Sequence, residues 1–421
     1  MSIFGAMFAG VSGLAAQSQA IGMISDNIAN VNTVGYKGLR ASFQTLVTQA
    51  ASQTLHSPGG VQSRPLQSVD AQGLLQSTSS VTDIAVIGNG FYVVNEAATP
   101  GSGDDYLYTR AGQFATDENG NLVNAAGYYL QGWPLDPTGA LPATPSVLSS
   151  TQTVNVSSLS GNAVPTTTMS LGANLPSTAT NGQTHSITAQ VFDALGNAHN
   201  LQVDFVYDAA TPEWDITVQN PTLASTGAVS GTVAGPVARS ISFDGVGTPA
   251  AITFPDIDIT WTATPAAPST ISGNLGTVGL TDGLTQFAGE FSIGFINQDG
   301  VRFGNFTGVN IDDDGFVTAL FDNGQQQPVY KLPLAVFPAP NSLELRDGNA
   351  YIETDGSGNV ILLEANTGAA GSVASSSLEA STVDLADEFT NMIVTQRAYS
   401  ANAKIITTAD EMLEELIRIR R

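Results

Sequence analysis

The sequence contains no cysteine among its 421 residues. This absence excludes disulfide bonds, thiolate metal sites, iron–sulfur clusters and a cysteine nucleophile. Histidine is almost as rare, because His56, His185 and His199 are the only three and no two of them form an HExxH pair. A GxSxG nucleophile motif is also missing. The sequence therefore predicts neither an enzyme nor a cofactor or metal site.

Basic residues are also scarce. Lys and Arg number 13 against 37 Asp and Glu, which gives a formal net charge of −24. Nucleic acid and anionic lipid both require a basic surface, so we expect neither as a partner. The first sixteen residues are apolar, but no basic residue precedes Lys37, and the run is shorter than the ~20 residues of a membrane span. We therefore expect no cleaved signal peptide and no membrane insertion.

Proline is absent from both ends of the chain. All twenty prolines lie between Pro58 and Pro340, which leaves 1–57 and 341–421 without any. Proline costs a helix interior about 3 kcal/mol, so this distribution predicts helical ends and a β-rich middle. The expected fold class is a mixed α and β, multidomain protein. Its long terminal helices would form a coiled-coil-like inner domain, with outer all-β domains nested between them.

Both ends carry apolar residues at the three- and four-residue spacing of a helix seam. The C-terminal seam, interrupted by the polar Gln396 and Asp410, consists of Leu385, Phe389, Met392, Tyr399, Ala403, Ile406, Leu413 and Ile417. The weaker N-terminal seam consists of Met7, Val11, Leu14, Ile21 and Ile28. Glycines inside the N-terminal segment make it a poor isolated helix, but they suit close packing against other helices. We expect the two seams to form an intramolecular hairpin and to drive assembly of the chain with copies of itself.

The middle of the chain shows strand and turn signals. The clearest is a hairpin over 186–208 with a turn at 193–197. Segments rich in Pro, Ser and Thr at 137–185 and 263–283 read as linkers. The expected domains are therefore 1–80 (N-terminal helix and connecting segment), 81–144 and 282–365 (two halves of a β domain), 145–281 (an inserted outer β domain) and 366–421 (C-terminal helix). One motif, Asn310-x-Asp312-x-Asp314-Gly315, resembles the start of a calcium loop but has Phe321 where the loop needs Glu, so we interpret it as a turn.

Two longer motifs stand at opposite ends of the chain. The first is Asn27-Ile-Ala-Asn30-Val-Asn32-Thr33-Val-Gly35-Tyr36-Lys37, and the second runs from Leu378 to Leu385 and on through Gln396-Arg397-Ala-Tyr399. Together they resemble the terminal signatures of bacterial flagellar rod and hook proteins. Shorter matches follow at 83–91, 110–114, 191–199 and 299–306. Rod members are much shorter and lack so large an insert, so the resemblance is greatest to the hook members.

The resemblance implies a structural subunit that polymerises with itself into a curved extracellular tube, the flagellar hook, which acts as a flexible universal joint and passes motor torque to the filament. It also implies the hook cap, the distal rod, the hook–filament junction proteins and the flagellar type III export apparatus as partners. Two alternatives remain open at this point: a distal rod protein of the same family, and an acidic secreted surface adhesin. From the residues alone, we expect Asn27, Asn30 and Asn32, with Thr33 and Gly35, to end the first helix and to form a turn.

Overall fold

A computed structural model of the chain describes residues 3–46, 59–101, 103–136, 139–157, 161, 163–235 and 237–419. The chain divides into two compact units. Unit 1 comprises Met1–Ser158, Gly308–Ala319 and Gln327–Arg421, and unit 2 comprises Leu159–Thr307 and Leu320–Gln326. Unit 1 therefore contains both ends of the chain, and unit 2 is an insertion in it. The prediction of helical ends around a β-rich middle is confirmed.

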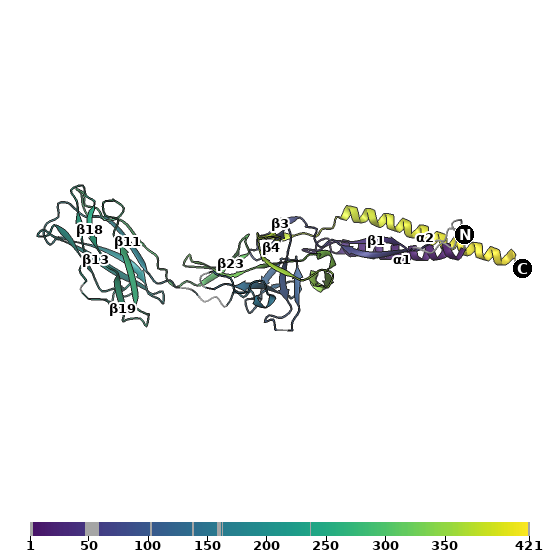
Figure 1. The fold of residues 1–421 in the computed structure, drawn as a ribbon, viewed down its shortest axis with the longest axis horizontal. Coiled ribbons are helices and arrows are strands. Elements are labelled where there is room, and N and C mark those ends of the chain that lie inside the picture. The colour runs from purple at the N-terminus through teal and green to yellow at the C-terminus, as the bar shows by residue number, and fades with distance from the viewer. Residues whose placement is uncertain are drawn as a thin grey trace. The chain divides into compact units, whose positions relative to one another are not determined.

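The two α-helices of the described chain are α1 (Ile3–Ala29) and α2 (Leu385–Ile419), and three short 3-10 helices cover Leu148–Ser150, Pro340–Ser342 and Asp347–Asn349. α1 and α2 lie side by side although they are the two ends of the sequence (Figure 1). The hairpin of β1 (Leu39–Thr45) and β2 (Val61–Gln67) packs along α1, and the Ser12 hydroxyl accepts a hydrogen bond of 3.2 Å from the Val61 amide. The terminal segments thus fold back on one another within one chain.

Small residues allow α1 to approach α2 closely. The most buried stripe of α1 is Gly10, Gly13, Ala16, Ala20, Ile24 and Asn27. A Cβ atom built on Gly10 would lie 3.2 Å from Ile406, and one on Gly13 would lie 2.8 Å from the Asn402 side chain. A larger residue at either position would require Ile406 or the Asn402 side chain to move. The glycines that weaken α1 as an isolated helix are therefore the residues that let it pack here.

The β structure of unit 1 surrounds an aromatic core. Tyr108 and Phe337 make an edge-to-face contact with ring centroids 4.8 Å apart, and Trp133 and Tyr351 are buried in the same cluster. Two small sheets pair β3 (Leu75–Ser77) with β30 (Ser377–Glu379) and β4 (Ile84–Ile87) with β29 (Ser372–Ser375). Both sheets join a segment from early in the chain to one from late in it.

The remaining strands of this part of the chain form one large sheet. Its strands are β5 (Phe91–Asn95), β6 (Tyr106–Thr109), β7 (Phe114–Thr116), β8 (Leu122–Asn124), β9 (Tyr129–Pro134), β10 (Gln152–Thr153), β22 (Phe306–Ile311), β23 (Phe316–Phe321), β24 (Gln326–Lys331), β25 (Pro333–Val336), β26 (Glu344–Arg346), β27 (Ala350–Ile352) and β28 (Ile361–Glu364). The unit boundaries fall within or beside β22, β23 and β24.

Unit 2 is a β-sandwich, because residues of two sheets share one apolar core. One sheet contains β11 (Thr168–Asn174), β16 (Gly231–Val233), β19 (Ile257–Trp261), β20 (Ser269–Asn274) and β21 (Ser292–Gln298). The other contains β12 (Thr184–Phe192), β13 (Ala198–Asp208), β14 (Glu213–Val218), β15 (Thr222–Leu223), β17 (Ser240–Phe243) and β18 (Pro249–Thr253). The predicted hairpin is confirmed as β12–β13, with Phe192 opposite Ala198 and the turn between them.

Unit 2 extends beyond the insert expected at 145–281. Strand β21 pairs with β11, and Leu284 is fully buried in the shared core, so the chain stays in this unit until Thr307. The Pro-, Ser- and Thr-rich segment 263–283 includes β20 and the buried Leu275. It is therefore part of the sandwich, because alternate residues of β20 face the core although the overall composition resembles a linker.

An Asp-x-x-Gly turn recurs in both units. In each case the Asp side chain accepts a hydrogen bond from the amide four residues later, and the glycine has a positive φ. The five aspartates and their N···O distances are Asp117 (2.7 Å), Asp136 (2.8 Å), Asp193 (2.9 Å), Asp244 (2.8 Å) and Asp312 (2.8 Å). Asp312 belongs to the calcium-loop-like motif, and its carboxylate closes the turn between β22 and β23.

We predict that acid destabilises unit 2 before unit 1. Hydrogen bonds from Thr248, Thr277 and Asn305 lower the pKa of Asp244, Asp282 and Asp322, respectively, and all three carboxylates belong to unit 2. A lowered folded-state pKa gives stability that is present above the ordinary Asp value of about 3.9 and is lost as the pH falls through the folded value.

Calorimetry between pH 7 and pH 3 tests this prediction. The unfolding transition of unit 2 should shift to lower temperature below about pH 4, and Asp244→Asn should reduce that pH dependence. A transition of unit 2 that is insensitive to acid would contradict the prediction.

Candidate assembly site

The N-terminal signature forms the turn that follows α1. Asn30 accepts a hydrogen bond of 3.0 Å from the Thr33 hydroxyl and donates one of 2.9 Å to the carbonyl of Asp26. Gly35 has φ of +68°, and a Cβ atom there would lie 2.9 Å from the backbone of Arg110 and of Ala111. Only glycine combines this conformation with so close an approach. Asn32 is exposed on the same turn.

Asn27 lies inside α1 and joins three segments. Its Nδ2 donates to the Leu39 carbonyl at 2.8 Å and to Glu388 Oε1 at 2.9 Å. Its Oδ1 accepts from the Leu39 amide at 2.8 Å and from the Tyr36 hydroxyl at 3.3 Å. Burial raises the pKa of Tyr36, with further contributions from Asp26 and Glu388, so the phenol remains a donor. Asn27 thereby connects α1, the start of β1 and the first turns of α2.

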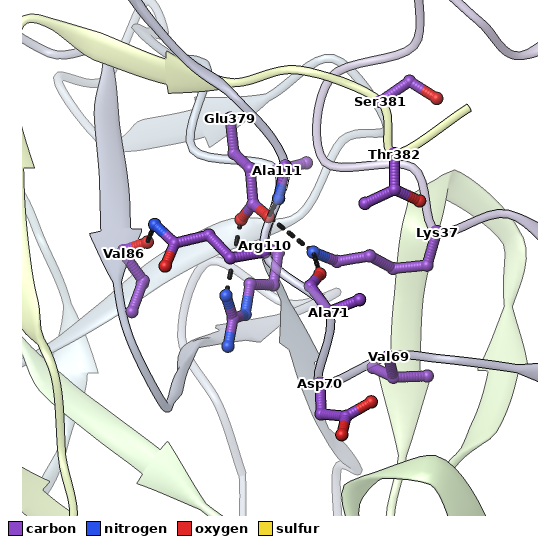
Figure 2. Close-up of polar contacts among 12 residues, drawn as sticks. Lys37, Val69, Asp70, Ala71, Val86, Arg110, Ala111, Glu379, Ser381 and Thr382 are labelled. Carbon is purple, nitrogen blue, oxygen red and sulfur yellow. Dashed lines mark hydrogen bonds and ion pairs between the residues drawn. The ribbon is translucent and has the colours of Figure 1, made fainter. Parts of the chain in front are cut away.

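Lys37 and Glu379 form a buried ion pair, 342 positions apart in sequence. Figure 2 shows the Lys37 ammonium pointing at both the Glu379 carboxylate and the Ala71 carbonyl. The same carboxylate accepts a hydrogen bond of 2.6 Å from the Gly73 amide, and its other oxygen lies 3.5 Å from Arg110 Nη1. We call Lys37, Arg110 and Glu379 the junction cluster. It ties the segment after α1 and the segment before α2 to the β structure.

The junction cluster holds two cations and one carboxylate, all with at most 1% exposed side chains. Burial lowers the pKa of Lys37, and the Glu379 carboxylate opposes that effect. The guanidinium of Arg110 also donates to the Gly88 carbonyl at 2.8 Å and lies 5.1 Å from the Phe91 ring centroid. Within the cluster, Lys37 and Arg110 therefore share a single counter-ion, the Glu379 carboxylate.

The C-terminal seam divides into two parts on α2. The side of α2 that packs toward α1 carries Glu388, Met392, Thr395, Ala398, Asn402, Ile406, Ala409 and Leu413. Met392, Ile406 and Leu413 of the predicted seam lie in this contact stripe, and Ala403 lies beside it. The other predicted seam residues are exposed, namely Leu385, Phe389, Tyr399 and Ile417.

Exposed apolar side chains follow both edges of the contact stripe. On one edge, Phe389, Ile393 and Tyr399 each come directly after a stripe position. We call these three residues, together with the exposed Leu385 and Ile417, the first apolar row. Residues that come directly before stripe positions are Val394, Ile405 and Met412, the second apolar row. Because one residue turns an α-helix by roughly 100°, the rows lie on opposite sides of the contact with α1.

The N-terminal seam lies off the buried stripe of α1. Met7, Leu14, Ile21 and Ile28 are half-buried, and Val11 is exposed. Phe4 and Phe8 add further exposed apolar surface, at 72% and 61%. The intramolecular contact thus uses the small residues of α1 and leaves its larger apolar residues available. A groove of about 1190 Å³ also opens between α1, β1, the segment 68–74 and the first half of α2.

The structure also places the remaining candidate residues of the sequence. Gln396 and Arg397 are exposed on α2. His199 is buried between Ser230 and Asp193, at 2.7 and 3.2 Å, and stacks on Trp261, while His185 stacks on Phe291. His56 lies outside the described residues. Within the described ranges, no group of three or more His, Asp or Glu residues could hold a metal ion, and no helix is long and apolar enough to cross a membrane.

We predict that the junction cluster responds asymmetrically to loss of its charges. Glu379→Gln leaves two buried cations without a counter-ion and should lower the free energy of unfolding of unit 1 by about 3–5 kcal/mol. Lys37→Met leaves the Arg110–Glu379 pair and should cost less. Urea unfolding measures both. Glu344→Gln, which removes an exposed partner of Arg346, is the matched control and should cost less than about 1 kcal/mol. A larger loss from Lys37→Met than from Glu379→Gln would contradict the charge balance described here.

Four family models match the chain in consecutive order. They are "Flagella basal body rod protein" at residues 7–37, "Flagellar hook protein FlgE/F/G D1 domain" at 85–185, "Flagellar basal body protein FlaE D2 domain" at 158–301 and "Flagellar basal body rod FlgEFG protein C-terminal" at 374–419. The first and last matches contain the turn after α1 and the segment before α2. The D2 match covers most of unit 2.

Full-length relatives agree with these matches. The chain is 33% identical to the flagellar hook protein FlgE of Caulobacter vibrioides and 34% identical to that of Brucella suis, with 100% of both chains covered in each case. A crystal structure of the Helicobacter pylori flagellar hook protein FlgE2 aligns with 14% identity and a TM-score of 0.47, covering 68% of this chain and 96% of that one. Since the identity to hook proteins exceeds 30% over the entire length, the chain belongs to the flagellar hook protein family and is a structural subunit of the flagellar hook.

Proposed function

We propose that this chain polymerises head-to-tail into a curved helical tube, in which α1 and α2 of each copy form a coiled-coil-like inner layer. The observation that carries the proposal is the pair of apolar rows on α2, on opposite sides of its contact with α1. A single chain leaves Phe389, Val394, Met412 and Ile417 between 53% and 67% exposed. Burial of such side chains is worth about 1.5–3 kcal/mol each, which supplies a driving force for assembly.

The two rows favour an open polymer over a closed dimer. They contain different residues and lie on different sides of α2, so they fit different surfaces of two neighbours. A surface that binds a different surface on the next copy gives a heterologous contact, which generates rings or helical filaments. The helical tube of a flagellar hook is the second of these outcomes.

The tube would act as a flexible joint that passes torque to the filament. Each unit has its own core and its own backbone hydrogen bonds, so neighbouring copies could slide at outer contacts without unfolding. The junction cluster would hold α1 and α2 to the β structure while load passes between them. We further propose the hook cap, the distal rod, the hook–filament junction proteins and the flagellar type III apparatus as partners, with the hook outside the cell as the location.

We predict that Phe389→Asp and Val394→Asp each block assembly of the purified full-length chain. Each places an unpaired charge in an apolar contact, which costs several kcal/mol. Each variant would keep one intact row, so it should still add to one end of a growing tube and stop further growth. A small proportion of either variant mixed with the unmodified chain should therefore shorten the tubes seen by electron microscopy, whereas the double variant should leave them unchanged.

The matched control is Val246→Asp, which changes a 72% exposed valine of unit 2 by the same chemistry. It should assemble normally, and circular dichroism of the monomers should show equal helix content in all variants. Normal tubes from both single variants would rule out the apolar rows as assembly surfaces.

We predict that unit 2 sets tube curvature but is not required for polymerisation. The apolar rows and the junction cluster all lie in unit 1, so replacing residues 159–307 with a short Gly/Ser linker should leave chains that still form tubes. Those tubes should differ in curvature, because contacts between copies of unit 2 would be lost. Electron microscopy decides between the outcomes. Unchanged curvature would show that unit 2 does not set the curvature of the tube. A complete lack of tubes would show that unit 2 contributes to assembly.

A further inference from the structure

The groove beside the start of α2 carries apolar side chains that one copy of the chain leaves uncovered. It has a volume of about 1190 Å³ and lies between α1, β1, the segment 68–74 and the first half of α2. We call it the proximal groove. Phe43, Leu74 and Val394 line it, and all three are exposed, Leu74 at 80%. Exposed apolar surface gathered in a groove marks a site where another molecule binds.

Charged side chains of both signs line the proximal groove. They are Arg40 on β1 and Asp384, Asp387 and Glu388 at the start of α2. The carboxylates of Asp384 and Glu388 accept hydrogen bonds within their own chain. Arg40 and Asp387 are exposed, and neither side chain has a hydrogen bond or ion pair with any described residue. The groove therefore offers one free cation and one free carboxylate beside its apolar residues.

The C-terminal end of α2 carries groups that complement those of the groove. Ile417 is an exposed apolar residue of the first apolar row, and Arg418 follows it with a side chain that is 75% exposed. Glu414, one turn earlier, is exposed as well. Arg418 lies 3.2 Å from Glu415, but both side chains of that pair are more than half exposed. Such a pair is weak, so Arg418 can bind a second carboxylate.

We propose that the C-terminal end of α2 in one copy docks in the proximal groove of the next copy, with the two α2 helices parallel. Ile417 then covers Leu74 and Val394, while Arg418 pairs with Asp387 and Glu414 lies toward Arg40. A residue of the first apolar row thereby meets a residue of the second. The proposal rests on the assembly proposed above and names the segment that fills one of its surfaces.

Helix geometry gives the axial displacement between the two copies. Asn391 lies midway along the part of α2 that lines the groove, and Ile417 comes 26 residues later. At 1.5 Å per residue, docking displaces the second α2 by about 39 Å. Since the 35 residues of α2 span about 52 Å, the two helices overlap by about 13 Å. A helix segment of that length and about 10 Å diameter occupies about 1000 Å³, which fits the groove.

This contact can continue from copy to copy. The groove and the C-terminal end of α2 are different surfaces at opposite ends of the helix, so each copy can use both at once in a heterologous contact. Two steps displace α2 by about 78 Å, which exceeds its length of about 52 Å, so α2 of the third copy does not overlap that of the first. A rotation at each step turns the series into a helix, as a tube requires.

A charge swap tests the contact in the full-length chain. Asp387→Arg should raise the critical concentration for assembly by roughly tenfold or more, because two cations then meet, and Arg418→Asp should do the same because two carboxylates meet. The double variant restores opposite charges and should restore assembly. Asp387 also stabilises the first turn of α2, but loss of that effect would not be rescued by Arg418→Asp.

The matched controls change exposed charges of unit 2. Glu290→Arg and Arg302→Asp alter the net charge as the two single variants do, away from α2, and should leave the critical concentration unchanged within about twofold. A loss that follows net charge alone would appear in these controls as well and would overturn the proposal.

The lack of cysteine allows a direct test of the register. In Asn391→Cys with Ile417→Cys, the two positions lie about 39 Å apart on one helix, too far for an intrachain disulfide. Oxidation of assembled protein should therefore give a ladder of covalent multimers under denaturing, non-reducing conditions. Each single variant should give no covalent product. Lys404→Cys with Ile417→Cys should link poorly, because the proposed register separates those positions by about 20 Å along the axis.

Three results would overturn the proposed docking. They are tubes of the 391/417 variant that give no ladder, a covalent dimer from Ile417→Cys alone, which would place two C-terminal ends together, and normal assembly of both single charge variants. If any of these occurs while Phe389→Asp still blocks assembly, the docking fails and the proposed assembly through the apolar rows stands. If Phe389→Asp and Val394→Asp also assemble normally, the proposed assembly fails as well.

Discussion

The organisation of this chain depends on apolar helix surface that one copy cannot bury. Each terminal helix uses one face for the other helix, and α2 then has exposed apolar side chains on both sides of that contact. Amphipathic helices gain most of their stability from packing, so the helix pair is incomplete in a single chain. We propose that neighbouring copies supply the missing contacts in the hook.

The junction cluster holds the segments next to both helices to the β structure of unit 1. Lys37 and Glu379 come from opposite ends of the sequence, and Arg110 comes from the β structure between them. A buried charge without its partner is strongly unfavourable, so the arrangement disfavours partial separation of these segments. Gly35 permits the close backbone approach that brings the terminal segment to Arg110. All three residues of the junction cluster belong to unit 1.

The sequence predicts well the elements in which apolar residues recur at a regular spacing. The spacing of Leu385 to Ile417 predicts α2, and alternation around Leu201 to Tyr207 predicts β13, because local geometry repeats the pattern. The junction cluster carries no such signal, since Lys37 and Glu379 meet only through the tertiary fold. The glycines of α1 indicate close packing against another helix, but the apolar spacing does not locate the contact face. It consists of small residues such as Gly13, whereas a search for large apolar residues selects the neighbouring face.

Hydrogen exchange measured on the monomer and on the assembled tube tests the central claim most directly. If neighbouring copies complete the helix pair, amides of α1 and α2 should exchange much faster in the monomer than those of the unit 1 β core, and should become strongly protected in the tube. Amides buried within the unit 2 sandwich should change little. Equal protection of α1 and α2 in monomer and tube would contradict the account, because it would mean that the helices are already complete in a single chain.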